Sequence, residues 1–207
     1  MKKFLKLFGL LVVIGILLLV VAGFAIHKAL PVGESGPAAD AMANRMLTAL
    51  NKVAYRNTRF LEWSFRDGAY RYKWDRWQSK VDVSWKDYVV KLNLKNPEKS
   101  LVMQKNEVLT GEEAEKLVAK ALKSFNNDSF WLVAPYKVFD QGTKRTLVTL
   151  EDGQEGLLIT YMQGGTTPGD SYLWLLDEKG FPKAYQLGVA IIPIVGLDSF
   201  LDVLRNT

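Results

Sequence analysis

The side chains that could perform catalysis are few in this chain. The sequence contains no cysteine and a single histidine, His27. The lack of cysteine excludes a thiol nucleophile, a disulfide framework, a zinc–thiolate site and a lipidated N-terminal cysteine. Because His27 follows a long hydrophobic run, the rest of the chain has no histidine for a Ser-His-Asp triad or a histidine metal site. We expect His27 to anchor the chain at a membrane boundary.

Asp67, Asp75, Asp82 and Asp87 are the remaining candidates for acid–base chemistry. A pair of carboxylates can serve as general acid and base, as in glycoside hydrolysis. These four residues lie at predicted turns or on the polar side of predicted strands, where a solvated charge is the usual state. We therefore predict no catalytic residue, no cofactor and no metal site, and an enzyme is the last of the functional hypotheses.

Two segments resemble nucleotide-binding or nucleic-acid-binding patterns in part, but each lacks a feature that such binding needs. Residues 164–169 are glycine-rich, but they lack the Gly-Lys-Ser/Thr ending of a phosphate loop. Residues 59–77 interleave cations with aromatic side chains, and a single-strand platform needs both kinds on one surface. The alternation in residues 70–74 instead sends aromatics to one face of a strand and cations to the other. We predict no nucleic-acid partner.

A run of 20 residues without charge, residues 7–26, follows three lysines near the N-terminus. A helix of this length spans about 30 Å, the thickness of a bilayer core. The lysines favour a cytoplasmic N-terminus. We therefore predict that residues 1–30 form a signal-anchor transmembrane helix in the cytoplasmic membrane, with the rest of the chain facing the periplasm. A cleaved signal peptide is the alternative, although its hydrophobic region is usually about 7–15 residues long.

The positive charge of the chain is concentrated near this predicted anchor. The formal net charge is +5, and four lysines against Glu34 account for +3 of it before Pro37. The remaining +2 is not the strongly basic footprint of a nucleic-acid-binding domain. Apolar residues form 48% of the chain, so we expect a packed core and not a disordered segment.

Residues 40–207 are predicted to form one α+β domain after a linker at residues 31–39. A helical pattern starts at Asp40, the predicted N-cap, and continues to Val53. The period of apolar residues then changes to two, which is typical of an antiparallel meander with one apolar face. The predicted strands are 61–65, 70–74, 81–85 and 88–94, with a short fifth strand at 101–103.

A second helix and a second meander follow. Thr110 and Glu113 form a predicted capping box, and residues 112–125 carry an apolar stripe. The later predicted strands are 146–150, 156–161, 172–176, 182–187 and 189–194. Beyond them, the spacing of Leu197, Phe200 and Leu204 favours a short helix. Together these elements predict a large curved antiparallel sheet, a half-open β-barrel, covered by two helices.

The apolar face of the first meander, with the stripe of the second helix, is the candidate ligand site. Its aromatic side chains fit an ordinary packed core. They also fit a concave sheet that keeps an apolar cavity under the helices. The candidate ligand-binding residues are Trp63, Phe65, Tyr72, Trp74, Trp85, Val90, Leu92, Leu117, Leu122 and Phe125.

Two segments resemble the LolA/LolB-like group of envelope lipoprotein carriers. Residues 126–137 resemble the group's helix-to-loop stretch, which ends in an apolar-Pro step. Residues 169–177, followed by 180–183, resemble its paired strands around an acidic-Gly turn with a Gly-x-Pro exit. The resemblance covers about residues 40–194 and is strongest in the order of the elements. It implies a half-open β-barrel around a helical lid, with a hydrophobic interior that holds acyl chains.

The expected function is therefore a non-enzymatic, periplasm-facing carrier or binding protein for lipid or lipidated protein. The chain differs from the soluble carrier of the group in its predicted anchor, and from the outer-membrane receptor in lacking a cysteine for lipidation. The alternative is a structural or interaction protein of an envelope complex, with a packed core and no ligand.

The predicted anchor leads to a direct test. We expect the chain in the membrane fraction to retain its N-terminal segment, because residues 7–26 are long enough to span the bilayer. N-terminal sequencing of that fraction measures this. A mature chain that starts at Ile26 would show that the segment is a cleaved signal peptide.

Overall fold

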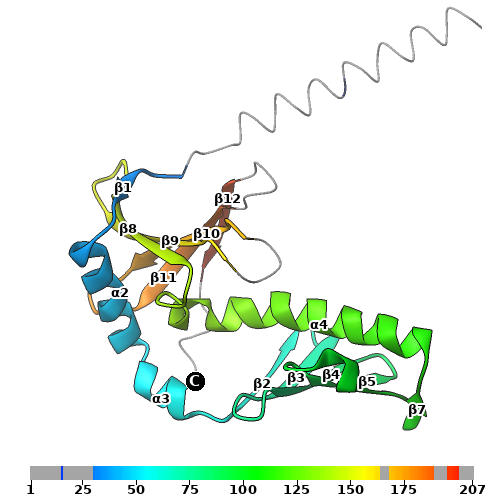
Figure 1. Cartoon of the computed structure of the whole chain (residues 1–207). Helices are drawn as coiled ribbons and strands as arrows, with labels where there is room; N and C mark the ends of the chain where they lie inside the picture. Colours follow the sequence, from blue (N-terminus) through cyan, green and yellow to red (C-terminus); the bar gives the residue numbers. More distant parts are fainter. Residues whose placement is uncertain (1–14, 16–29, 164–167, 189–194, 201–207) are drawn as a thin grey trace, which may run out of the picture. The chain divides into compact units, whose positions relative to one another are not determined.

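The computed structural model describes Gly15 and residues 30–163, 168–188 and 195–200 (Figure 1). Apart from Gly15, the predicted anchor lies outside the described residues, and so does the predicted strand at 189–194. Among the described helices, none is both long and apolar enough to cross a membrane. The chain divides into two compact units. The terminal unit combines Met1–Leu50 with Val138–Thr207, and the central unit is Asn51–Lys137.

The central unit contains an antiparallel sheet whose six strands pair in sequence order. The strands are β2 (Phe60–Phe65), β3 (Tyr70–Asp75), β4 (Lys80–Trp85), β5 (Tyr88–Asn93), β6 (Leu101–Gln104) and β7 (Glu107–Leu109). The four longer strands form where the period-two pattern predicts them. The sequence does not predict β7, because its hairpin turn is Lys105-Asn106, with φ of 48° and 72°. Lysine is not typical of such left-handed turn positions.

The alternation along these strands matches the burial of their side chains. Tyr72 and Val83 form a cross-strand pair, and both are buried. Their neighbours Arg71 and Lys73 are exposed, and Lys73 forms an ion pair with Glu62 at 2.9 Å. One face of the sheet is therefore apolar and the other polar, as predicted for the first meander.

The helix α4 (Glu112–Val133) packs against the apolar face of this sheet (Figure 1). It begins at the predicted residue but is 22 residues long and continues past Phe125. The capping-box prediction is wrong, because the N-cap is Gly111 and no side chain caps the helix start. Three glutamates in the first turn lie near the positive end of the helix dipole instead.

The first predicted helix is divided in two. α2 (Pro37–Ala49) belongs to the terminal unit, and α3 (Lys52–Asn57) begins the central unit. The break is at Asn51, which has φ 50° and accepts a hydrogen bond from the Ala54 amide at 3.1 Å. Asparagine tolerates this left-handed conformation and can cap the next helix. The continuation of one apolar face to Val53 is therefore wrong, and Val53 is exposed.

The terminal unit contains a second six-stranded sheet, in the order β1-β8-β9-β10-β11-β12. The strands are β1 (Gly33–Glu34), β8 (Thr143–Thr149), β9 (Glu155–Tyr161), β10 (Ser171–Leu176), β11 (Pro182–Gly188) and β12 (Val195–Phe200). β1 lies within the predicted linker. β12 pairs with β11, so the prediction of a helix is wrong for residues 195–200, while residues 201–207 lie outside the described residues.

Helix α2 is fixed to the terminal sheet by two arginines. Arg145 on β8 forms an ion pair with Asp40, which lies in the first turn of α2 and is not its N-cap. Arg45 on α2 donates to the carbonyl oxygens of Asp177 and Glu178 in the β10–β11 turn, at 2.9 and 2.7 Å. These contacts hold α2 against β8 and against the turn.

The structure confirms the α+β class and the antiparallel strands, but it corrects the layout. The described strands form two open six-stranded sheets and not one large sheet. Helices interrupt the strand sequence between β1 and β2 and again between β7 and β8. Since neighbouring strands in an antiparallel meander pair locally, β2–β7 form one sheet and β8–β12 form another, which β1 joins by pairing with β8. Each long helix packs on the sheet of its own unit: α2 on the terminal sheet and α4 on the central one.

The facing of β3 leads to a paired test. Trp74→Asp puts a charge among apolar side chains that pack on the central core, and we expect a loss of several kcal/mol of stability. Arg71→Asp changes an exposed side chain, and we expect a loss under about 1 kcal/mol. Chemical unfolding of the two variants measures both effects. Equal losses would contradict the assigned strand register.

Candidate ligand site: an aromatic cluster and an adjoining groove

The structure brings all ten candidate residues together in the central unit. They lie on β2, β3, β4, β5 and α4 and belong to one hydrophobic cluster. The buried members are Tyr72, Trp85, Val90, Leu92 and Phe125. The half-buried members are Trp63, Phe65, Trp74, Leu117 and Leu122. The period-two pattern of the strands and the apolar stripe of the second predicted helix are therefore sufficient to predict that these ten residues lie together.

Phe125 of α4 is the point at which the helix contacts the aromatic side chains of the sheet. Its ring lies edge-on to Trp74, with ring centres 5.2 Å apart. It is tilted against Trp63 and Tyr72 at 6.2 and 6.4 Å. Trp63 and Tyr72, which are cross-strand partners, stack at 4.7 Å. Such aromatic pairs contribute about 0.5–1.5 kcal/mol each beyond the area they bury, so this end of α4 is firmly held.

A buried carboxylate lies one helical turn beyond Phe125. Asp128 is 1% exposed, and its carboxylate accepts a hydrogen bond of 2.5 Å from the Tyr72 hydroxyl. The Asn127 amide also donates to it, at 3.0 Å, and a guanidinium nitrogen of Arg66 lies 4.0 Å away. Burial and the hydrogen bond to Asp128 both raise the pKa of Tyr72, so this phenol remains a donor at physiological pH. The sequence gives no sign that this aspartate is buried.

Two indole groups of the cluster are buried without hydrogen-bond partners. Within the described part of the chain, neither the Trp63 nor the Trp74 Nε1–H has an acceptor. A buried donor without a partner is costly, by about 1–3 kcal/mol. These two N–H groups are therefore available to an acceptor oxygen if α4 moves away from them.

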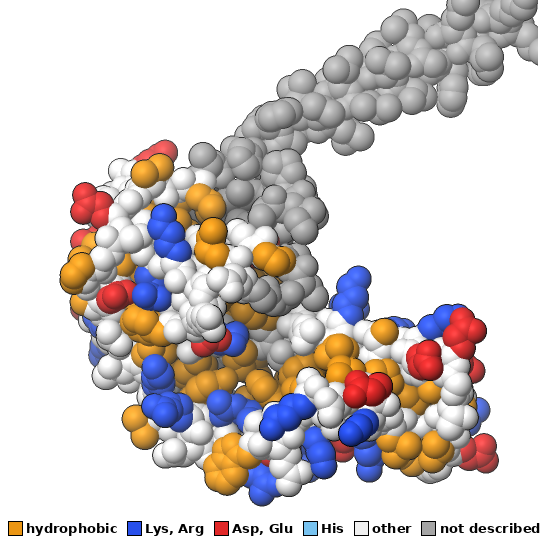
Figure 2. Space-filling view, in the orientation of Figure 1, with side chains coloured by type: hydrophobic (Ala, Val, Ile, Leu, Met, Phe, Trp, Pro, Cys, Tyr) orange, Lys and Arg blue, Asp and Glu red, His pale blue; other side chains and the backbone are white. Residues whose placement is uncertain are grey.

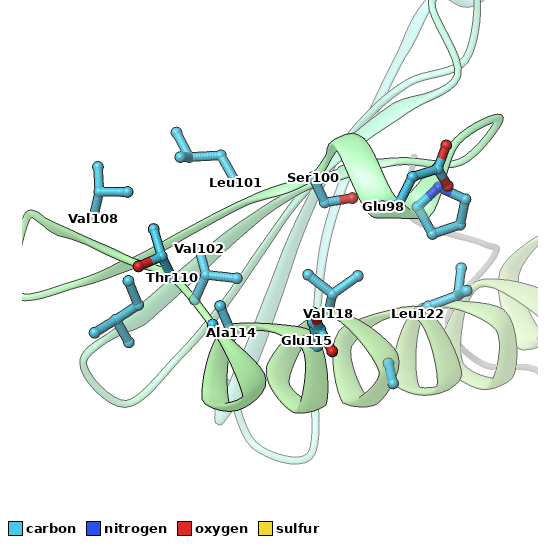
Figure 3. A pocket seen from close by; sticks show the side chains of 14 residues that line it. Glu98, Ser100, Leu101, Val102, Val108, Thr110, Ala114, Glu115, Val118 and Leu122 are labelled. Atoms are coloured by element: carbon cyan, nitrogen blue, oxygen red, sulfur yellow. The ribbon is translucent and has the colours of Figure 1, made fainter.

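An apolar groove of about 490 Å³ adjoins this cluster (Figure 3). It lies between the first half of α4 on one side and β6, β7 and the short helix η1 (Pro97–Lys99) on the other. Its lining residues are Pro97, Glu98, Ser100, Leu101, Val102, Val108, Leu109, Thr110, Gly111, Ala114, Glu115, Val118, Ala119 and Leu122. Of the ten candidate residues only Leu122 lines it. The lining residues on η1 and β7 are missed because the sequence does not predict these elements. Apart from Leu122, those on β6 and α4 lie on predicted elements but are not among the ten candidates.

The polar side chains that line the groove are few. Ser100 and Thr110 supply hydroxyls, and the Ser100 hydroxyl accepts a hydrogen bond from the Asn93 backbone amide at 3.0 Å. Glu98 and Glu115 supply two carboxylates. The described residues contain no group of three or more metal-binding side chains. Because the remaining lining residues are apolar apart from Gly111, the groove is suited to binding apolar groups.

Two large aromatic side chains of the central unit are exposed to solvent and lie outside the cluster. Phe60 and Trp77 are 48% and 64% exposed, and the Arg59 guanidinium lies over both rings, at 4.7 and 5.7 Å. Arg59 also forms an ion pair with Asp75 at 2.7 Å, which lowers the pKa of that carboxyl. Figure 2 shows hydrophobic side chains interspersed with Lys and Arg on the visible surface. Alternation predicts the facing of residues 70–74 but not the exposure of these two rings.

The buried Tyr72–Asp128 contact leads to a stability test. Tyr72→Phe keeps the ring but removes the hydroxyl that donates to the buried carboxylate. We expect a loss of about 1–3 kcal/mol, because Asp128 loses its shortest hydrogen bond. Tyr88→Phe is the control, since Tyr88 is only half-buried and its hydroxyl accepts a long hydrogen bond of 3.2 Å from the Gln104 side-chain amide. Urea unfolding followed by tryptophan fluorescence measures both, and equal effects would show that the contact adds nothing.

Comparison with known proteins identifies no relative of this chain. No family model matches the sequence, and the searches of curated proteins and of solved structures find no match. The function must therefore be inferred from the chemistry of the groove and the aromatic cluster.

Proposed function

We propose that this chain is a non-enzymatic carrier or binding protein for lipid or lipidated protein. In this proposal residues 7–26 tether it to the cytoplasmic membrane, and the rest of the chain faces the periplasm. The observation that carries the proposal is the groove of about 490 Å³ between α4 and the β6–β7 edge. Its size lies within the range of about 300–1,000 Å³ that is typical of ligand sites.

The lining of the groove favours a hydrocarbon chain as its ligand. Nine of its lining residues are apolar: Pro97, Leu101, Val102, Val108, Leu109, Ala114, Val118, Ala119 and Leu122. Leu101 and Val108 remain exposed. Each Å² of apolar surface removed from water contributes about 25 cal/mol, so an acyl chain laid along this surface would be held without any polar recognition.

Helix α4 is suited to be a movable cover because its two halves are packed differently. Its buried residues are Ala121, Phe125, Asp128, Ser129 and Val133. They lie from the middle of the helix onward. In the first half Ala114, Leu117 and Val118 are only half-buried. Regions with few buried contacts open at a lower free energy than the core. We propose that the first half of α4 opens while the second half stays attached to the sheet.

The resemblance to the LolA/LolB-like group supports this proposal through the order of the elements. That group has a half-open barrel with a helical lid, and in this chain we propose that the open central sheet and α4 take these two roles. The central unit contains both parts that such a binding fold needs: an open sheet with an apolar face, and a long helix across that face.

A structural or interaction protein with a packed core is the second candidate. The observation that favours it is the complete burial of Val81, Val83 and Val90 on the sheet. If α4 never leaves the sheet, these contacts belong to an ordinary core.

Hydrogen exchange on the full chain in a lipid-free peptidisc distinguishes the two candidates. We expect the amides of residues 113–122 to exchange faster than those of β5 and of residues 125–133. Adding a short-chain phospholipid or an acylated peptide should slow them selectively, because a ligand stabilises the state that binds it. Residues 125–133 are the internal control, since they belong to the same helix but do not line the groove.

The packed-core candidate predicts a different result. Residues 113–122 would then be as protected as β5, and neither ligand would change their exchange. That outcome would reject the carrier proposal.

A further inference from the structure

We infer that the groove takes an acyl chain with a positively charged group beside it, as in the acylated, lysine-bearing terminus of a polypeptide. This inference rests on the proposed function and specifies its ligand class. The charged side chains on the groove walls are negative, whereas the net charge of the chain is positive.

The two charged residues among those that line the groove are both acidic. They are Glu98 and Glu115, and no lysine or arginine lines it, although the chain has 27 basic and 22 acidic residues. Lys99 and Lys116 are their sequence neighbours but do not line the groove. Lys116 instead forms an ion pair with Glu112 at 2.7 Å.

Among the described residues, these two carboxylates are not paired with a basic side chain, whereas some other acidic residues of the central unit are. Glu62, Asp75 and Glu112 each form an ion pair with a basic side chain at 2.7–2.9 Å. Among the described residues, no ion pair involves Glu98 or Glu115. Their charge is therefore available to a ligand.

Glu98 and Glu115 come from opposite walls of the groove (Figure 3). Glu98 belongs to η1 and Glu115 to the first turn of α4. The apolar side chains of Val102, Val118 and Leu122 complete the lining of the same walls. A chain held by these apolar groups would bring its head group near the two carboxylates. A cation there is attracted, whereas a phosphate or a carboxylate is repelled.

The test measures the binding of three peptides, two octanoylated and one without an acyl group, to the full chain in a lipid-free peptidisc. The probes are octanoyl-Gly-Lys-Lys-Ser-amide, octanoyl-Gly-Glu-Glu-Ser-amide and the first peptide without its acyl group. Calorimetry gives the affinities, and methyl NMR signals of Val102, Val118 and Leu122 report binding in the groove. We expect the acylated lysine peptide to bind roughly tenfold more tightly than the glutamate peptide, as two exposed ion pairs allow. Added salt should reduce this preference.

Substitution of Glu98 and Glu115 tests whether the two carboxylates cause the preference for the acylated lysine peptide. Glu98→Gln with Glu115→Gln should bring the two acylated peptides to within about twofold of each other while retaining the methyl shifts. The matched control is Glu113→Gln, which removes a charge from the same helix turn but not from the groove lining. It should leave the preference unchanged.

The possible failures are separable. Equal binding of the two acylated peptides, or a preference for the glutamate peptide, would overturn the inference and leave the proposed function intact. Equal binding of the plain and acylated lysine peptides would show a surface charge effect and overturn it as well. If no acylated peptide shifts the groove methyl signals, the inference and the carrier proposal both fail.

Discussion

The hydrogen bond between Tyr72 and Asp128 determines how α4 lies on the central sheet. A carboxylate that is 1% exposed is costly unless it is paired, and the Tyr72 hydroxyl meets it at 2.5 Å. Because Tyr72 is fixed in register by β2 and β4, the bond sets both the rotation of the helix and its position along its axis. Together with the packing of Phe125 on the aromatic rings of the sheet, this contact fixes which side chains of α4 line the groove.

The same helix therefore has two roles along its length. Its buried side chains begin at Ala121, and Phe125 contacts three aromatic rings of the sheet. Up to Leu122 the helix also forms one wall of a groove whose opposite wall comes from η1, β6 and the short edge strand β7. A two-turn offset from the buried carboxylate is enough to change the environment of the helix from core to groove.

The sequence predicts the parts of this arrangement that depend on local periodicity. Alternation identifies Tyr72, Val83 and their facing, because a one-residue slip of a strand would turn every apolar side chain outward. It does not predict that the meanders form separate sheets, since strand pairing depends on what interrupts the strands. The break at Asn51 and the turn at Lys105-Asn106 depend on left-handed residues that composition does not reveal.

The candidate site divides in the same way. The ten side chains of the cluster could be predicted because each lies on an apolar stripe of a regular element. Part of the groove lining could not, because it comes from η1, from β7 and from residues flanking α4. Asp128 could not be predicted either: a charged residue after two asparagines is typical of a helix end, whereas here it lies inside α4 and is buried against Tyr72.

The buried indole groups lie where α4 is most firmly attached to the sheet. Trp63 and Trp74 each bury an N–H that has no acceptor among the described residues, and both rings contact Phe125. Separation there would expose these donors to water, which recovers part of the free energy lost with the apolar contacts. It would also leave the Asp128 carboxylate without its Tyr72 donor in a largely apolar site, and that cost has no such compensation. The first half of α4 makes neither contact, so in the proposed opening the free energy cost rises along α4 toward its C-terminal end.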